Sequence, residues 1–435
     1  MSAPARGLAP RMRPLLPRRS AIVAALDIGT SKVTCLIGRL KPLAEDDAMR
    51  GRSHAVEVIG LGHTRAEGIK AGVIADLAPA EEAIRSAVDM AERSAGMEIA
   101  SIVVACGGGR LASESFTASV SLPGASVDEG DIGRVLDTAS AHSVRGGRAV
   151  LHSLPVAYGL DQTRGIGNPT GMIGRSLSVD LHVITAETAG LKNLMLCVER
   201  CHLSVEGVIA APYAAGLGVL SADELELGAT VIDFGAGTTS AAVFTDGHCL
   251  HIDGIAIGSH HITTDLARGL SIRLPEAERL KVLHAAVLAS PSDEHRVITI
   301  PTIEGRAAPA AASLGQIVRV AKPRAEEILE MLHQRLRAAD MLGPSSRRIV
   351  LTGAAAELTG LTELAGRVFK TTARLGRPLG VTGLDEEART PAFAVASGLL
   401  IYPQFAAREH FEQHRRGRSE KNYLVRVGRW LQESF

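Results

Sequence analysis

Residues 231–240 read VIDFGAGTTS, an apolar run that ends in an aspartate and passes into a glycine turn followed by hydroxyl side chains. Residues 26–32 read LDIGTSK and repeat this order, with Asp27 in the place of Asp233. A second apolar run follows each copy, so each copy predicts a β-hairpin. Two such hairpins that face each other can clamp a triphosphate, which favours a two-lobed nucleotide-binding protein.

The two turns have the chemistry of a phosphate site. Glycine lacks a Cβ, so backbone N–H groups can approach phosphate oxygens, and nearby hydroxyls can donate to the same oxygens. The two aspartates would repel phosphate unless a cation lay between them, and Mg²⁺ suits such a site. Lys32 would add positive charge. The expected nucleotide contacts are Asp27, Gly29, Thr30, Ser31, Lys32, Asp233, Gly235, Gly237, Thr238 and Thr239, with Asp27 and Asp233 also expected as metal ligands.

A third glycine turn follows the apolar run at 348–352. We expect a buried strand there, a nucleotide contact at Gly353 and a helix that begins near Ala354, because nucleotides often bind where a strand leads into a helix N-terminus. The alternative is an ordinary strand–helix loop.

The three segments resemble the two phosphate motifs and the adenosine motif of the actin/Hsp70/sugar-kinase superfamily. Within it the chain most resembles the FtsA family of bacterial cell-division proteins, over residues 21 to 402 and at the C-terminal end. The supporting segments are 151–185, 191–209, 220–239 and 397–403. The resemblance implies an α/β, two-lobed actin-like ATPase fold with an inserted α+β subdomain in the first lobe.

Strand and helix patterns alternate after residue 21, as expected for α/β lobes. With the resemblance, they predict the following order: a disordered basic tail at 1–20, the first-lobe core at 21–99 and 183–215, the inserted subdomain at 100–182, the second-lobe core at 216–262 and 346–402, a small FtsZ-docking subdomain at 263–345, a charged flexible linker at 403–421 and an amphipathic membrane-targeting helix at 422–435. The helical pattern at 314–341 is expected to break at Lys322-Pro323.

The resemblance also assigns roles in the small subdomain. Glu278 and Lys281 would reach the ribose and base of ATP, although the same pair also fits a surface ion pair three residues apart. Arg324 and Glu327 would bind the carboxy-terminal peptide of the tubulin-like FtsZ; the alternative is a solvated helix face. The inserted subdomain would contact neighbouring subunits in actin-like filaments and later division proteins.

Four positions depart from the family pattern: Ala236, Ser240, Ser259 and Ala354. Where glycine is usual, the added Cβ narrows access to the nucleotide, so we expect weaker binding than is usual in the family.

Hydrolysis needs a group that orients the attacking water. Ser240 stands where the family has an aspartate, and Ala211 precedes Pro212 where Hsp70-like proteins carry a glutamate. The sequence therefore predicts a structural protein with no catalytic residues and weak ATPase activity at most. The alternatives are a phosphotransferase or ATPase of the same fold, for which no general-base motif is found, and an actin-like adaptor of a pilus machine.

The last residues form an amphipathic pattern. At 100° per residue the apolar side chains gather on one face and Arg426 and Arg429 on the other, as in a helix that lies on anionic lipid. The only tryptophan of the chain, Trp430, suits an interfacial anchor. The alternative is a helix that docks on its own domain. The expected membrane contacts are Leu424, Arg426, Val427, Arg429, Trp430, Leu431 and Phe435.

The amino-acid composition limits the remaining classes of function and the cellular compartment. Lys+Arg and Asp+Glu both total 47, which disfavours general nucleic-acid binding. Five scattered cysteines favour a reducing cytosol. The first 20 residues are rich in arginine, like a transit peptide, but prolines interrupt any secretory signal. Together with the amphipathic C-terminal pattern, the family resemblance implies a peripheral protein on the cytoplasmic face of the bacterial inner membrane, at the division septum.

Overall fold

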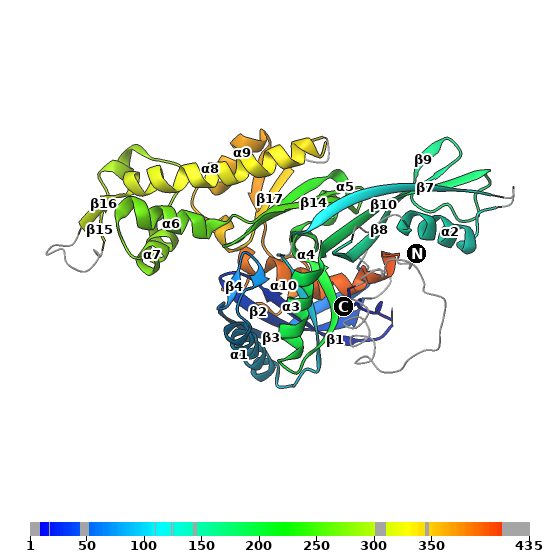
Figure 1. Ribbon diagram of the computed structural model, residues 1–435, viewed down its shortest axis with the longest axis horizontal. Helices are drawn as coiled ribbons and strands as arrows, with labels where there is room; N and C mark the ends of the chain where they lie inside the picture. The colour runs from blue at the N-terminus through cyan, green and yellow to red at the C-terminus, as the bar shows by residue number, and fades with distance from the viewer. Residues whose placement is uncertain are drawn as a thin grey trace.

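The computed structural model describes residues 9–16, 18–43, 52–108, 110–122, 124, 126–141, 146–300, 310–343 and 348–410. Within these ranges the chain forms two lobes, each around one mixed sheet, and a separate subdomain that projects beside them (Figure 1). The expected two-lobed α/β fold with an inserted subdomain is confirmed.

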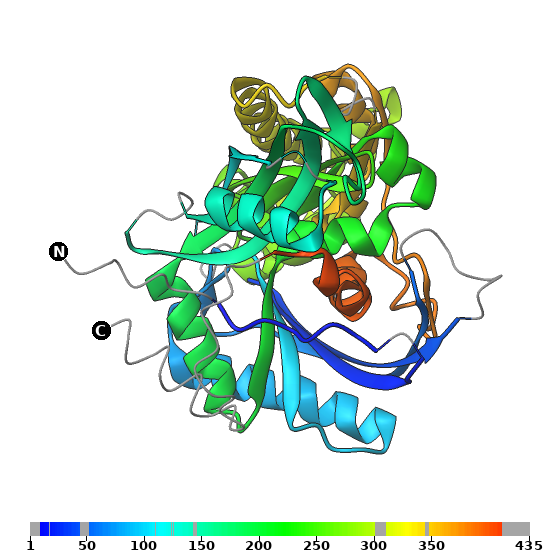
Figure 2. The same ribbon diagram turned by 90° about the vertical axis from the view of Figure 1, so that its right-hand side faces the viewer.

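The first-lobe sheet has the strand order β11-β6-β1-β2-β3-β19. β1, β2 and β3 pair antiparallel, whereas β6 and β11 add to β1 in parallel. Helix α10 lies on one face of this sheet and α1 on the other (Figure 2). The elements are β1 Ala21–Ile28, β2 Lys32–Pro42, β3 His54–Arg65, β4 Ile69–Lys70, β5 Val73–Ile74, α1 Leu77–Ala95, β6 Ser101–Cys106, α3 Thr188–Glu199, β11 Ser204–Ala210, α4 Ala211–Val219, β19 Val381–Thr382 and α10 Ala394–Ile401.

The second-lobe sheet repeats this plan with the order β14-β13-β12-β17-β18. Its first three strands again pair antiparallel, and β17 and β18 again add in parallel. The elements are α5 Ala222–Leu227, β12 Ala229–Phe234, β13 Thr239–Thr245, β14 His248–Ile255, β17 Arg348–Thr352, α9 Leu361–Phe369 and β18 Thr372–Leu375. The equivalent hairpins β1–β2 and β12–β13 therefore occupy equivalent places in the two lobes.

The small subdomain of the second lobe is mainly helical. It consists of α6 Ser259–Leu270, α7 Leu274–His284, β15 Val297–Ile300, β16 Ala310–Ser313 and α8 Leu314–Ala338. The expected break at Lys322-Pro323 is wrong, because α8 continues through it. Pro323 lies on the exposed side, while the buried stripe runs on through Ala321 and Ala325 and holds the two halves of the helix in line.

The inserted subdomain has its own sheet, in the order β7-β10-β8-β9, and its own apolar core. Its elements are β7 Ala112–Ser121, α2 Glu129–Ser140, β8 Arg148–Leu160, β9 Thr163–Ile166 and β10 Ser176–Glu187. The expected boundary at residue 100 is too early, since β6 pairs with β1 and β11 in the first-lobe sheet.

Both expected terminal segments are partly folded. Ala9 is buried, and its N–H donates to Val150 O at 3.3 Å, so the basic tail expected at 1–20 packs on the body from residue 9. The linker expected from 403 begins later, because the Glu409 side chain is only 2% exposed and accepts a hydrogen bond from His152. Residues 411–435, including the expected membrane helix, lie outside the described residues. Among those described, no helix is long and apolar enough to cross a bilayer.

Candidate functional site

The two hairpin turns close in the same way. The N–H of Gly29 donates to Lys32 O at 3.0 Å, and the N–H of Gly235 donates to Thr238 O at 3.0 Å. A Cβ on either glycine would lie within 3 Å of the carbonyl it pairs with. The turn is therefore tight enough to require glycine at both positions.

The two turns also face each other across the lobes. A Cβ on Gly237 would lie 2.5 Å from Oγ1 of Thr30 in the opposite lobe. Between them is a cavity of about 80 Å³. Ten of the predicted residues line it: Asp27, Gly29, Thr30, Ser31, Lys32, Asp233, Gly235, Gly237, Thr238 and Gly353. Three segments that are far apart in the sequence thus meet at one place.

Thr239 does not join them as expected. It is fully buried, and its hydroxyl donates to Ile257 O at 2.8 Å, so it braces the loop after β14. Residues that sequence reasoning missed also line the cavity, among them Gly72, Gly107 and Ala392. The run of three glycines at 107–109 was a usable signal. Gly72 had no such signal in the sequence; the structure shows its N–H donating to Thr30 Oγ1 at 3.0 Å.

The electrostatics of the cavity favour a cation. Burial raises the pKa of Asp27 to about 6, against the opposing effect of Lys32. Burial, with a smaller contribution from the charge of Asp27, raises the pKa of Asp233 to about 7. Two carboxyls from opposite lobes therefore resist joint ionisation, and a divalent cation between them would remove that penalty.

Lys32 is tethered beside these carboxyls. Its Nζ donates to Ala392 O at 3.1 Å and lies 3.5 Å from the centre of the Phe393 ring. Burial lowers the pKa of Lys32 to about 8, and Asp27 opposes that shift. These contacts hold the ammonium at the edge of the cavity, where it could pair with a phosphate.

The third turn closes the floor of the cavity. Gly353 has φ 85°, and a Cβ there would lie 2.3 Å from Oδ1 of Asp233. The prediction that a helix begins near Ala354 is wrong. A 3₁₀ turn spans Ala354–Glu357, and the helix α9 begins later, at Leu361. Ala354 borders both this cavity and a second, larger one.

The larger cavity, of about 530 Å³, lies between the small subdomain and the third turn. Lys281 and Ser259 line it on one side, and Ala355 and Leu358 on the other. It is large enough for a nucleoside, whereas the smaller cavity suits phosphate groups. Glu278 does not line it and is half-exposed.

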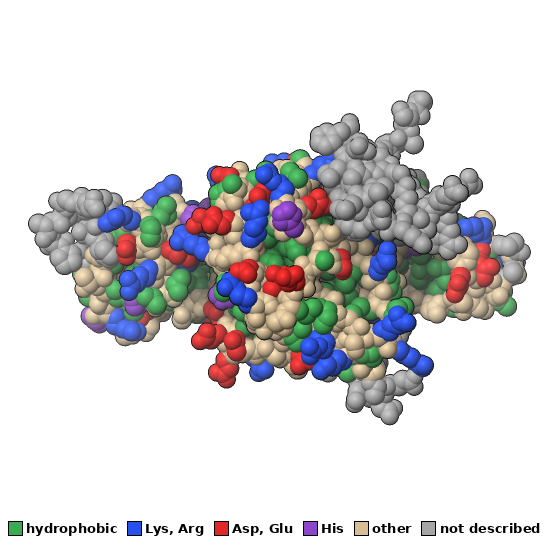
Figure 3. Space-filling view, turned by 90° about the horizontal axis from the view of Figure 1, so that it is seen from below, with side chains coloured by type: hydrophobic (Ala, Val, Ile, Leu, Met, Phe, Trp, Pro, Cys, Tyr) green, Lys and Arg blue, Asp and Glu red, His purple; other side chains and the backbone are tan. Residues whose placement is uncertain are grey.

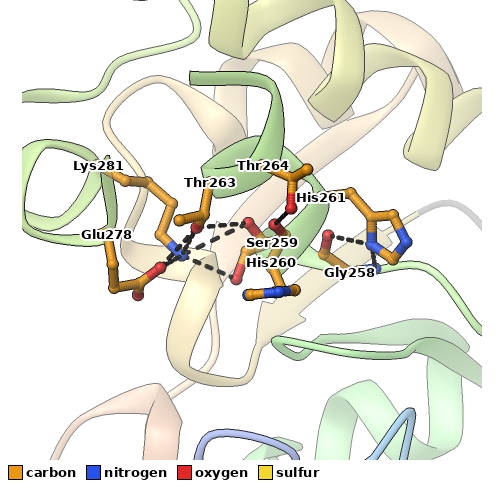
Figure 4. A network of polar contacts seen from close by, with 8 residues as sticks. All are labelled: Gly258, Ser259, His260, His261, Thr263, Thr264, Glu278 and Lys281. Atoms are coloured by element: carbon orange, nitrogen blue, oxygen red, sulfur yellow. Dashed lines mark hydrogen bonds and ion pairs between the residues drawn. The ribbon is translucent and has the colours of Figure 1, made fainter. Parts of the chain in front are cut away.

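Lys281 belongs to a polar network that Figure 4 shows. Its Nζ contacts Glu278 Oε2 at 2.8 Å, Thr263 Oγ1 at 3.0 Å and Ser259 Oγ at 3.4 Å. The N–H of Ser259 in turn donates to Gly235 O at 3.0 Å. The network therefore connects the wall of the larger cavity with the turn of the second lobe, and the ion pair expected as the alternative role is present.

The departures from the family pattern stand beside this site. The carbonyl oxygen of Ala236 accepts a hydrogen bond from the N–H of His260 at 2.8 Å. Ser240 lies opposite Asp233 in the β12–β13 pairing. Neither places a bulky group in the cavity.

The predicted partner residues lie on α8 and line neither cavity. Arg324 Nε pairs with Asp265 Oδ2 at 2.7 Å, and its Nη1 pairs with Glu327 Oε2 at 2.5 Å. The pKa of Arg324 is raised by these partners. The predicted membrane contacts all lie in 411–435, outside the described residues.

Comparison with known proteins identifies relatives along almost the whole chain. Residues 230–398 match the family model of "Cell division protein FtsA", and residues 108–185 match that of the "SHS2 domain inserted in FTSA". Cell division protein FtsA of Agrobacterium fabrum is 48% identical over 435 residues, covering 98% of each chain. That of Escherichia coli is 33% identical over 419 residues, covering 94% of this chain and 96% of the relative.

Solved structures show the same fold at low identity. A chain of the PilM-PilN type IV pilus biogenesis complex has a TM-score of 0.62 and 15% identity, covering 88% of this chain and 98% of its own. MreB5 of Spiroplasma citri bound to ADP has a TM-score of 0.52 and 15% identity, covering 89% and 97%. These likenesses establish an actin-like architecture.

Proposed function

Since the chain belongs to the FtsA family of bacterial cell-division proteins, we propose that it is an ATP-binding, actin-like scaffold that attaches FtsZ filaments to the cytoplasmic face of the inner membrane at the septum. The observation that carries the proposal is the cavity between the lobes, where two aspartate-ended turns face each other. A ligand bound there contacts both lobes at once and so biases their closure.

The site fits ATP with Mg²⁺. The raised pKa values of Asp27 and Asp233 indicate a place where positive charge is needed. Backbone N–H groups of the two turns and Lys32 would hold the phosphates, and Lys281 would contact the nucleoside in the larger cavity. MreB5 of Spiroplasma citri, which has this fold, is bound to ADP in its solved structure. Bound Mg²⁺ would neutralise the facing carboxylates and the phosphates.

We propose a structural role with weak ATPase activity at most. Ala211 and Ser240 carry no carboxylate or amide that could orient water for attack on a phosphate. The site therefore favours retention of the nucleotide over turnover. No described residue singles out a phosphotransferase.

The proposed partners occupy different parts of the molecule. The FtsZ peptide would bind the small subdomain near Arg324 and Glu327, and the inserted subdomain would contact later division proteins. The lobes would self-associate into actin-like filaments. The amphipathic pattern at 422–435 would hold the assembly on anionic lipid as a peripheral protein.

Two measurements test the proposal. ATP with Mg²⁺ at a hundred times its Kd should stabilise the protein by about 2.7 kcal/mol, and this gain should disappear in Asp27→Asn. Cosedimentation with anionic vesicles and FtsZ should be strongly reduced in Trp430→Glu, which keeps the nucleotide response. Absence of any shift at millimolar ATP contradicts the nucleotide site, whereas unchanged sedimentation of Trp430→Glu contradicts the anchor.

A further inference from the structure

The two ends of the described chain lie close together on one strand of the inserted subdomain. The N–H of Ala9 donates to Val150 O at 3.3 Å, and the N–H of His410 donates to Ser153 O at 2.9 Å. Both acceptors belong to β8 and are three residues apart, so the two attachments are separated by about 10 Å. The described chain therefore ends, at His410, close to the point at which it begins, at Ala9.

Beyond these attachments the two segments share further contacts with the first lobe. Pro10 O accepts from the N–H of Val208 at 3.2 Å, which fixes the N-terminal segment along β11. Its other end is held where His54 Nε2 contacts Arg19 O at 3.0 Å. The N–H of His54 also donates to Gln404 Oε1 at 2.9 Å. Residues 9–16, 18–20 and 402–410 therefore form one surface, which we call the terminal surface.

The terminal surface has an unusual charge pattern. Residues 9–20 contain four arginines and no acid. Of these, Arg13, Arg18 and Arg19 are exposed, and Leu16 between them is 58% exposed. On the face that Figure 3 shows, acidic and basic side chains are interspersed. The backbone contacts fix the segment in place, so it presents its arginines without the entropy cost of ordering a free tail.

We propose that Arg13, Arg18 and Arg19 bind anionic lipid head groups and form a second membrane contact beside the C-terminal helix. This inference rests on the proposed function for the anchor that brings the surface to the bilayer. Eleven residues, 411–421, span at most about 40 Å when fully extended, so an anchor at 422–435 would be tethered within that distance of the terminal surface. The guanidinium groups would bind phosphate oxygens of the head groups in pairs, and the exposed Leu16 would enter the interface beside them.

The expected effect follows from the number of charges. Each arginine near an anionic surface contributes about fivefold in binding, so loss of three with reversal of charge weakens binding by well over tenfold. Because these charges are exposed, the contribution falls as salt rises. Binding to neutral phosphatidylcholine depends on the apolar face of the anchor and stays unchanged.

The test is cosedimentation of the full chain with phosphatidylglycerol/phosphatidylcholine vesicles and with phosphatidylcholine alone. The variant Arg13→Glu/Arg18→Glu/Arg19→Glu is compared with a control of equal charge, Arg164→Glu/Arg279→Glu/Arg367→Glu, whose arginines are exposed elsewhere. The proposal expects at least tenfold weaker binding of the first variant than of the control, on the anionic vesicles only. Equal binding of the two variants to anionic vesicles overturns it, as does an equal loss on neutral vesicles.

A second arm separates this inference from the anchor. Trp430→Glu is measured alone and together with the triple arginine variant. If the arginines act as proposed, the combined variant binds anionic vesicles more weakly than Trp430→Glu. If Trp430→Glu alone has no effect while the arginine variant is released, the proposed anchor fails and the lipid contact of the terminal surface stands. If only FtsZ recruitment changes in the arginine variant, the segment binds a protein and the lipid proposal is wrong.

Discussion

Asp233→Asn should make the ligand-free protein more stable at neutral and alkaline pH. The pKa of Asp233 is raised from 3.8 to about 7, so the folded protein keeps a proton that the unfolded chain has lost over this interval. The free energy of unfolding therefore falls as pH rises through this range and levels off above it. At 1.36 kcal/mol for each pKa unit, the ionised carboxyl costs the fold up to about 4 kcal/mol.

The variant lacks this cost, since an amide does not ionise. About 2 kcal/mol of the difference should develop between pH ~5.5 and ~8, with the variant the more stable at the upper end. Urea unfolding followed by circular dichroism, which reports on the secondary structure of both lobes, measures this difference. Asp223→Asn, an exposed aspartate on α5, serves as the control.

The same variant should lose the stabilisation that ATP with Mg²⁺ gives the wild type. Removal of one facing carboxylate relieves the repulsion but also removes a proposed ligand of the cation. If the unfolding free energies of wild type and Asp233→Asn change in parallel with pH, the account of facing buried carboxyls is refuted. A variant that gains stability yet responds fully to the nucleotide would remove Asp233 from the proposed metal site.

Three further predictions concern the two cavities and α8. Gly237→Val should push the two turns apart, because its Cβ would lie 2.5 Å from Thr30 Oγ1. ATP binding should then weaken by at least about tenfold in a fluorescent-nucleotide titration. Affinity equal to that of the wild type would show that the turns do not close on the ligand. Lys281→Met should weaken ATP binding several-fold while inorganic triphosphate binds as before; an equal loss for both would place Lys281 at the phosphates. Arg324→Gln should weaken binding of the FtsZ peptide in anisotropy measurements, whereas Asp265→Asn, which removes one of the two partners of the guanidinium and keeps the guanidinium itself, should not; loss in both variants would indicate damage to α8 itself.

Local features were predicted well because they depend on residues close in sequence. The turn between β1 and β2 needs a glycine and a short apolar strand on each side, and all three requirements are visible in 26–38. The same holds for the second hairpin and for Gly353. The pairing of these segments across one cavity was expected from their repetition, and the structure brings ten of the predicted contacts together.

The errors have a common physical origin. Pro323 is a strong local signal for a helix break, but the buried residues on both sides of it outweigh the loss of one hydrogen bond. No local sequence feature of the strand at 101–106 assigns it to the first lobe or to the inserted subdomain. Only its parallel pairing with β1 places it in the first-lobe sheet. Thr239 resembles its neighbour Thr238, yet it is the first residue of β13 and its hydroxyl is buried against Ile257 O, whereas Thr238 belongs to the turn and lines the cavity.

By itself the sequence determined which segments could make phosphate-binding turns, because backbone conformation in a tight turn is set by the few residues within it. It also determined the family, through long stretches of similar residues. The tertiary structure decided which turns face each other, which carboxyls share a cavity and therefore ionise with difficulty, and that Ala9 and His410 attach to the same strand. Those properties depend on burial and on distances between residues far apart in the chain, and only packing of the two lobes fixes them.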